Sequence, residues 1–393
     1  MKKRCITESI PVTQMYEEQL CKAVSQSMNI NNMHFDSVKS ALYRFRNSYI
    51  PKLPSTLSEV DIPPKWQLDN AGNQFLRYVT PMPVKVLIFV TDRALKELAL
   101  SEHWNVDGTF KTTPRPFYQV YTIHTYNKLS MKPSVYCLLP SKHRESYNAM
   151  INGLLFLANS NGITLNPKTI MLDFEEAAIL AFNQHFPNAL TKGCYFHFTK
   201  NLWKKLAKQK NGTRIYKNNR EVRSCIANVF ALPLVPPEQI PSVFADTHDL
   251  IPSDMTAVQV FFDYVCDTYV EEEYFERGFW NLFDVFDLRP KTNNAVEGYH
   301  RKQNSRVSAH PNVYRWIEQI RKEEDFARCR DILESNTGLP SKKRRKENEE
   351  NDFALCLAKT ASTIEAIDIN EYLEHVRKTA YRFIHNVGGK DAE

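Results

Sequence analysis

The sequence predicts an α/β fold in which a mixed sheet is flanked by helices, with further helical segments at both ends. Two features of its central part indicate this class. Three β-type segments, rich in aromatic and branched residues, follow one another at 103–110, 117–126 and 133–140, separated by turns that contain Pro and Asn. After them, apolar strand patterns alternate with helical patterns. We therefore expect an antiparallel meander that continues into strand and helix alternation.

The order of the remaining elements narrows the fold class. The expected segments are a strand at 84–90, a helix at 92–100, the three strands of the meander, a helix opened by residues 141–146, a strand at 169–173, a helix at 175–186, a strand at 189–194 and a basic helix at 197–210. From the meander onward this order is β-β-β-α-β-α-β-α. It is the order of an RNase H-like fold, a mixed sheet between helices.

The pattern divides the chain into six segments. We expect a helical leader at 1–80, the first part of the RNase H-like core at 81–210, an acidic helical insertion at 211–288, return helices of the core at 289–340, a charged linker at 341–352 and a C-terminal helical segment at 353–393. The leader ends in a Pro-broken stretch, and the insertion contains a Pro-rich break at 232–241.

Charge is distributed unevenly along the chain, although the net charge is only +6. Residues 197–223 contain nine Lys or Arg and one acid, 238–287 contain twelve acids and one Arg, and 289–330 contain ten basic and five acidic residues. The two basic blocks could neutralise phosphates, whereas the acidic block would repel nucleic acid. The alternative is that each block is a solvated helix face.

The composition also limits the compartment. No segment has the pattern of a signal peptide or of a membrane span, so no membrane partner is expected. Eight cysteines are scattered without a CxxC pair, which favours a reducing compartment over a disulfide framework. A cytosolic or nuclear protein is expected.

Three acids stand at positions suited to chemistry, and each has a structural alternative. Asp107 lies in VDGTF, where Asp-Gly is also a hairpin signal. Asp173 ends an apolar strand, where open α/β sheets place ligand-binding groups, but Asp173 and Glu176 also fit a capping box. Glu297 has the same ambiguity, because Asn294 to Glu297 is another capping-box match.

Four sequence blocks resemble, in order and separation, the signature blocks of Mutator-like (MULE) transposases. They are VDGTFK, IMLDFEEA, CYFHFTKNLWKKL and RPKTNNAVEGYHRKQN, and the resemblance covers about residues 75–330. It implies a DDE site of Asp107, Asp173 and Glu297 that holds Mg²⁺ or Mn²⁺. The implied reaction is cleavage of DNA phosphodiester bonds and strand transfer by two-metal in-line displacement, for which hard oxygen ligands are suited. It also implies DNA as the partner, a homo-oligomer on DNA, and a nuclear location.

Further residues are candidates for contacts with DNA. They are Lys200, Lys204, Lys205 and Lys208 in the basic helix, His300, Arg301 and Lys302 after the third acid, and Trp280. Trp280 could stack on an unpaired base, and its alternative is a core aromatic of the insertion. The basic run from Lys342 to Lys346 predicts a nuclear import signal, or else a disordered tether.

Cys194 and His197 resemble the CxxH block of the same family and are candidate zinc ligands. They supply only two of the four ligands that structural zinc requires, and His300, His310 or Cys225 could complete the set. The alternative is a packed Cys and a His that caps or hydrogen-bonds at the head of the basic helix.

The sequence departs from the family at its amino terminus. Many members carry a zinc finger there, whereas Cys5, Cys21 and His34 have no finger spacing. This motivates a second hypothesis beside the enzyme: a domesticated or truncated transposase-derived protein that binds DNA without catalytic activity.

Overall fold

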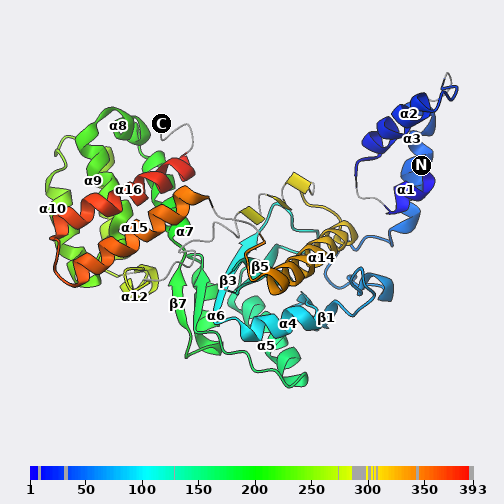
Figure 1. The fold of residues 1–393 in the computed structure, drawn as a ribbon, viewed down its shortest axis with the longest axis horizontal. Helices are drawn as coiled ribbons and strands as arrows, with labels where there is room; N and C mark the ends of the chain where they lie inside the picture. The colour runs from blue at the N-terminus through cyan, green and yellow to red at the C-terminus, as the bar shows by residue number, and fades with distance from the viewer. Residues whose placement is uncertain are drawn as a thin grey trace.

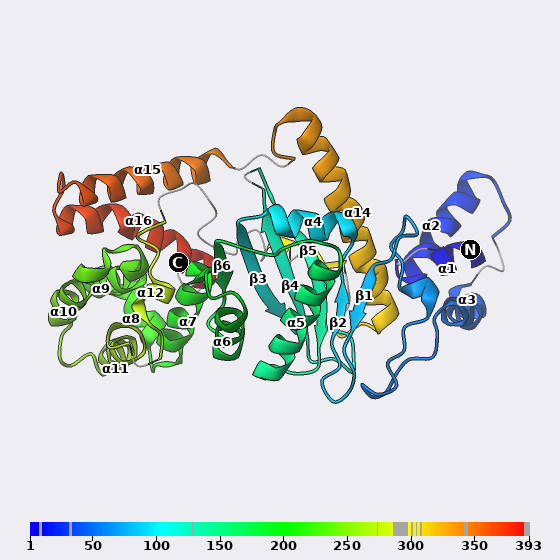
Figure 2. The same cartoon turned by 90° about the horizontal axis from the view of Figure 1, so that it is seen from below.

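The computed structural model describes residues 1–7, 10–30, 34–127, 129–272, 274–285, 298–299, 302–303, 305–306, 309–341 and 345–388. Three bodies follow one another along its longest axis: a small group of amino-terminal helices, a central sheet with its helices, and a helical lobe (Figures 1 and 2). Among the described residues, no helix is both long and apolar enough to cross a bilayer.

A seven-stranded mixed sheet forms the centre, with the order β1-β2-β5-β4-β3-β6-β7. The strands are β1 (Leu76–Val79), β2 (Leu87–Phe89), β3 (His103–Thr109), β4 (Gln119–Tyr126), β5 (Met131–Leu139), β6 (Thr169–Leu172) and β7 (Leu190–Gly193). The pairs β1-β2, β2-β5, β5-β4 and β4-β3 are antiparallel, whereas β3-β6 and β6-β7 are parallel. The expected α/β class and the mixed sheet are confirmed.

Strand β1 corrects the expectation of a purely helical leader. The leader does contain helices α1 (Lys2–Thr7), α2 (Val12–Ser25) and α3 (Phe35–Tyr49), with a small core of their own. Its last residues, however, pair antiparallel with β2 and extend the sheet by one strand. Four residues at a sheet edge are too few for a period-two pattern to stand out from a loop.

Helices cover both faces of the sheet. On one face, α4 (Asp92–Leu100), α5 (Arg144–Ser160) and α6 (Glu176–His185) contribute to the same apolar core as Ile88 and Val106. On the other face, α14 (Val313–Thr337) packs Trp316 and Ile320 against Phe89 in a second core. Helix α14 lies within 289–340, the segment expected to return to the core after the insertion.

The helical lobe joins two segments that are distant in sequence. It contains α7 (Tyr195–Lys208), α8 (Gly212–Asn218), α9 (Arg220–Ala231), α10 (Ile240–Asp249), α11 (Thr256–Val265), α12 (Arg277–Trp280), α15 (Lys346–Thr363) and α16 (Ile369–Gly388). Helices α8 to α12 lie in the segment assigned from the sequence to the insertion, of which 273 and 286–288 lie outside the described residues. The C-terminal segment packs into it, since the rings of Tyr195 and Phe383 lie 4.7 Å apart. Residues 346–352, expected in the linker, form the first turns of α15.

Two buried lysines hold the chain where it leaves the lobe, and we call them the lysine clamp. Lys192 of β7 donates to the carbonyl oxygens of Gly278 and Asn281, at 3.0 and 2.9 Å. Lys359 of α15 donates to those of Leu282 and Val285. Because a buried ammonium must be compensated, these contacts fix the path of residues 278–285.

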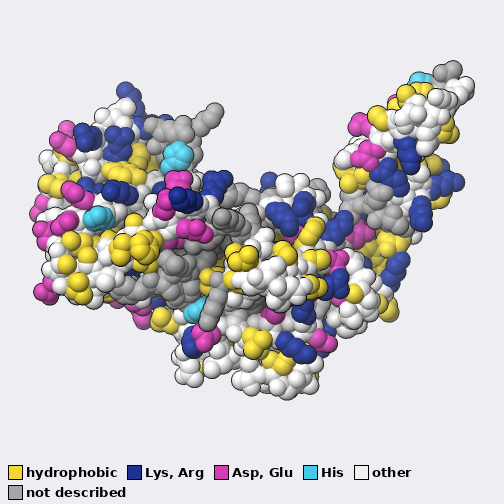
Figure 3. All heavy atoms as spheres, viewed as in Figure 1, with side chains coloured by type: hydrophobic (Ala, Val, Ile, Leu, Met, Phe, Trp, Pro, Cys, Tyr) yellow, Lys and Arg dark blue, Asp and Glu magenta, His cyan; other side chains and the backbone are white. Residues whose placement is uncertain are grey.

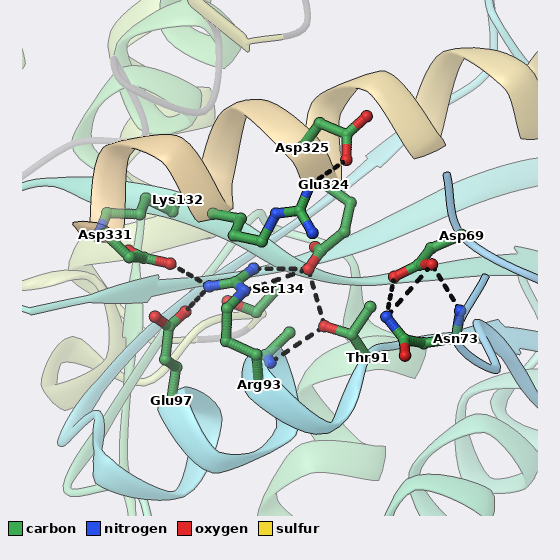
Figure 4. Close-up of polar contacts among 12 residues, drawn as sticks. Asp69, Asn73, Thr91, Arg93, Glu97, Lys132, Ser134, Glu324, Asp325 and Asp331 are labelled. Atoms are coloured by element: carbon green, nitrogen blue, oxygen red, sulfur yellow. Dashed lines mark hydrogen bonds and ion pairs between the residues drawn. The ribbon is translucent and has the colours of Figure 1, made fainter. Parts of the chain in front are cut away.

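An ionic network fixes α14 against the sheet (Figure 4). The guanidinium of Arg93, on α4, lies 2.7 Å from Glu324 of α14 and also contacts Asp331. Lys132 of β5 lies 2.6 Å from Glu334, near the end of the same helix. Burial opposes the charged form of Glu334, yet hydrogen bonds from Lys132, Ser341 and Asn127 lower its pKa to about 2.

Replacing Lys132 should test how much this network contributes to stability. We expect Lys132→Met to lower the free energy of unfolding by about 3–5 kcal/mol, because Glu334 would remain charged and buried without its cation. The control is Lys168→Met, which breaks an ion pair of the same 2.6 Å length between side chains that are 68% and 51% exposed. Its loss should stay below about 1 kcal/mol. Equal losses in denaturant titrations would contradict this role of the network.

Candidate active site

The parallel pairing of β3 with β6 brings Asp107 and Asp173 together. The register pairs His103 with Thr169 and Asn105 with Met171. Two residues further along both strands, Asp107 comes level with Asp173, the first residue after β6. Side chains alternate along a strand and neighbouring strands lie about 4.8 Å apart, so both carboxylates are on the same face. Both residues lie toward the carboxyl ends of two parallel strands, where open α/β sheets bind ligands.

The structure excludes the structural alternatives for these two acids. Asp107 and Gly108 lie inside β3, opposite Thr122 and Tyr121 of β4, so the Asp-Gly pair is not a hairpin turn. Asp173 does not cap α6, because the N-cap position belongs to Glu175. Both acids are therefore placed by the sheet. Glu297 lies outside the described residues.

The electrostatics of this end of the sheet show crowded negative charge. Burial, and then the nearby Glu175 carboxylate, raise the pKa of Asp173 to about 6, although Lys142 and Lys200 oppose the shift. Burial also raises the pKa of Tyr121, to which Asp173, Glu175 and Asp107 all contribute. A divalent cation would favour the charged form of these carboxylates, and their hard oxygens suit Mg²⁺.

The two carboxylates do not complete a metal site with other described residues. No group of three His, Cys, Asp or Glu side chains suited to an ion occurs within the described ranges. The third ligand expected from the sequence is Glu297, which is not among them. The carboxylate oxygens of Asp107 and Asp173 thus fit a cation. The described residues supply two of the three ligands expected from the sequence.

Both ends of the segment that contains Glu297 flank the face that carries Asp107. Before it, Asp284 and Val285 line a cavity of about 140 Å³ together with Asn105 and Met171. After it, the ring of Tyr299 lies 5.1 Å from that of His124, in an edge-on contact. His124 is the partner of Asn105 across β3 and β4. The chain therefore leaves and rejoins the described structure over this one face.

The basic helix α7 carries the expected lysines in different settings. Lys200, Lys204 and Lys208 are each separated by about one turn and form one stripe, and Lys204 and Lys208 are exposed. Lys205 lies 4.4 Å above the ring of Tyr264. In Figure 3, Lys and Arg side chains gather over the top of the helical lobe around α8, and acidic side chains lie along its outer edge.

The residues expected after the third acid are only partly described. His300 and Arg301 lie outside the described residues. Lys302 is described, and its ammonium lies 2.7 Å from Glu323 of α14 and 4.8 Å from the ring of Phe326. Glu323 also pairs with Arg306 at 3.2 Å. These contacts attach the segment around Lys302 to α14. The positive charge of Lys302 is paired with Glu323.

Trp280, a candidate for stacking on a DNA base, has the buried position of its alternative, a core aromatic. Its side chain is only 1% exposed and lies stacked on Phe198, with ring centroids 5.7 Å apart, and edge-on to Tyr269. Phe279 and Phe275 extend the same aromatic cluster. Trp280 is thus a core residue of the lobe, because its apolar surface is already covered by other rings.

The candidate zinc ligands Cys194 and His197 lie at the head of α7. Cys194 is buried just before the helix, and His197 is in its first turn. Of the residues proposed to complete the set, His310 contacts Lys111 and Thr113, Cys225 is in α9, and His300 lies outside the described residues. Within the described ranges, no third ligand joins the pair.

Sequence reasoning missed several polar residues beside Asp173. Glu175 accepts a hydrogen bond from the hydroxyl of Tyr147, and Lys142 lies 3.5 Å from its other oxygen. Gln119 in turn donates to Tyr147. The block IMLDFEEA contains Glu175, but its contacts come from a helix and a strand that no local pattern connects to it.

Replacing Trp280 distinguishes a core role from a DNA contact. We expect Trp280→Ala to lower the free energy of unfolding by about 3–5 kcal/mol, the usual cost of removing a large buried aromatic. Tyr274→Ala, at a 71% exposed position of the same lobe, should change it by less than about 0.5 kcal/mol. Unchanged stability of Trp280→Ala in denaturant titrations, with weakened DNA binding, would restore the stacking role.

The comparisons with known proteins agree with part of this description. Residues 103–201 match the family model of the MULE transposase domain. A search of the curated proteins found no match. The matched segment runs from β3 into α7, so it includes Asp107, Asp173, Cys194 and His197, whereas Glu297 lies beyond it. For this segment, which is narrower than the resemblance seen in the sequence, the match supports the MULE family and indicates a transposase-type function.

Proposed function

We propose that this protein is a DNA transposase of the MULE type that cleaves DNA phosphodiester bonds and transfers strands in a Mg²⁺-dependent reaction. The observation that carries the proposal is the alignment of Asp107 and Asp173 at the carboxyl ends of two parallel strands. That alignment lies within the segment that matches the transposase domain. Structural acids of a sheet are seldom placed side by side, since like charges repel.

The strand order supports an RNase H-like core as part of this proposal. The meander β3, β4, β5 forms one half of the central sheet, and β6 and β7 add in parallel on the other side of β3. Helices α5, α6 and α7 follow β5, β6 and β7 in turn. This is the order on which the fold expectation from the sequence was based.

Asp107, Asp173 and Glu297 are the residues that would hold the cations. Two Mg²⁺ or Mn²⁺ ions held there would activate a water or 3′-hydroxyl and stabilise the leaving oxygen. The chain itself orients the first two carboxylates through the register of β3 and β6. Lys200 is close enough to Asp173 to lower its pKa, so it is placed to meet a phosphate there.

Glu297 is proposed as the third ligand because the described residues before and after it lie over the face of the sheet that carries Asp107. The lysine clamp holds residues 278–285, and Asp284 borders the cavity on the Asp107 face. Tyr299 lies against His124 on that face, only two residues after Glu297. Both anchors lie over the same strands, which supports a carboxylate near Asp107.

The remaining parts of the proposal concern partners and location. The α7 stripe of Lys200, Lys204 and Lys208 would contact the phosphate backbone of DNA. A homo-oligomer on DNA and import into the nucleus through the basic run at 342–346 complete it. Residues 342–344 lie outside the described residues, and Arg345 and Lys346 are exposed.

Substitution of the aligned acids tests the catalytic part. Purified protein should nick DNA with Mg²⁺ or Mn²⁺. Asp173→Asn or Asp107→Asn should slow nicking at least about a hundredfold, because the cation that stabilises the transition state would lose a charged ligand. Asp249→Asn, on an exposed residue of α10, should retain wild-type activity. Equal nicking by wild type and Asp173→Asn would show that the aligned acids do not catalyse it.

The contact of Lys200, Lys204 and Lys208 with DNA is tested by the salt dependence of the DNA-binding constant, measured without metal. Lys204→Ala should weaken DNA binding and reduce the slope of log K against log salt by about one, as expected for loss of one phosphate contact. Lys168→Ala, which removes a lysine paired with Glu102, should leave the slope unchanged. Steep salt dependence with no nicking under any metal would favour the alternative, a DNA-binding protein without catalytic activity.

A further inference from the structure

A chain of hydrogen bonds leads from the middle of the sheet to the turn that contains Asp173. The side-chain amide of Gln119, on β4, donates to the hydroxyl of Tyr147 at 2.7 Å. That hydroxyl donates to the carboxylate of Glu175. Gln119 and Tyr147 are both fully buried. We call this chain the Gln-Tyr-Glu relay; it joins β4, α5 and the start of α6.

The second oxygen of Glu175 is also engaged. Lys142 lies 3.5 Å from it and 4.5 Å above the ring of Phe110, the residue that follows β3. With one oxygen on Tyr147 and the other on Lys142, the Glu175 carboxylate is held from two sides. These two contacts hold the Glu175 side chain against α5 and the segment that precedes it.

Glu175 is connected to Asp173 by a short turn of the backbone. Residues 173–175 join the end of β6 to the start of α6. The contacts of the Glu175 side chain with Tyr147 and Lys142 attach this turn to neighbouring elements. A turn held in this way limits the positions that the backbone of Asp173 can take.

Helix capping does not explain these contacts. Glu175 occupies the N-cap position of α6, where a side-chain oxygen commonly accepts from the first turn, yet it makes no such hydrogen bond. Its oxygens are directed instead to Tyr147 and Lys142. If Glu175 served only to cap α6, its side-chain oxygen would accept a hydrogen bond from the first turn of that helix.

We propose that Glu175, held by Gln119 and Tyr147, is a positioning residue that fixes the Asp173 carboxylate for cation binding. This inference rests on the proposed function and adds residues to it. Groups that orient a metal ligand without touching the metal commonly change metal affinity or activity by about 10–100-fold when removed. The relay has the arrangement of such a support.

The first test is Tyr147→Phe, which removes only the hydroxyl. The nicking rate at saturating DNA should fall by about 10–100-fold, and the Mn²⁺ concentration for half-maximal rate should rise. The matched control is Tyr195→Phe, which removes a buried hydroxyl that donates to the carbonyl oxygen of Phe230 in the helical lobe, at 3.0 Å. It should leave the Mn²⁺ dependence unchanged. A merely structural hydroxyl would affect thermal unfolding in both variants alike and the Mn²⁺ dependence in neither.

Glu175 itself supplies the second test. Glu175→Gln keeps an oxygen that can accept from Tyr147, so it should retain more Mn²⁺-dependent activity than Glu175→Ala. The same order should hold for Mn²⁺ affinity, measured from the paramagnetic resonance signal of free Mn²⁺. Equal behaviour of the two variants would overturn the relay.

The outcomes separate this inference from the proposed function. If wild type nicks DNA and Tyr147→Phe behaves like Tyr195→Phe, the relay is wrong and the proposed function stands. If wild type binds Mn²⁺ but never nicks, the proposed function fails, and weaker Mn²⁺ binding by Tyr147→Phe still supports the relay. Absence of Mn²⁺ binding by wild type would overturn both.

Discussion

The parallel pairing of β3 with β6 is the constraint on which the candidate site depends. It sets Asp107 level with Asp173 on one face of the sheet. A slip of one residue would turn one carboxylate to the opposite face, because side chains alternate along a strand. The antiparallel partner β4 holds β3 from its other side. The central position of β3 therefore makes this register hard to change, and the apolar residues of α5 and α6 fix it further.

The helical lobe and α14, which follow Asp173 in the chain, also support the candidate site. The chain leaves the lobe through the lysine clamp, one half of which, Lys359, comes from the C-terminal segment. It returns through α14, which the Arg93 and Lys132 contacts hold against α4 and β5. Buried lysine contacts with carbonyl oxygens therefore hold the chain at 278–285, and ionic contacts hold it at α14. The C-terminal helices, which sequence alone separates from the core, are part of the support of the site.

The sequence predicts the elements of the sheet well where their patterns are long. Strands β3 to β6 follow dense apolar or aromatic runs. That Asp107 and Asp173 share a site is implied only by the resemblance of the sequence blocks to MULE transposases. The burial of Trp280 and the packing of α16 on α7 depend on contacts between distant residues, which no local period contains. Glu175 is missed for the same reason, because its function follows from Tyr147 and Gln119 on other elements.

The distribution of buried charge distinguishes the site from its scaffold. Lys132, Lys192 and Lys359 are buried beside carboxylates or carbonyl oxygens that compensate them. At the ends of β3 and β6, carboxylates instead neighbour one another, and the pKa of Asp173 is raised by burial and by Glu175. A chain selected for stability alone would separate such groups or replace them, because like charges repel most strongly where water is excluded. Local conflicts of this kind are retained where function requires them. The raised pKa of Asp173 is therefore a feature that the cation of the proposed function would relieve.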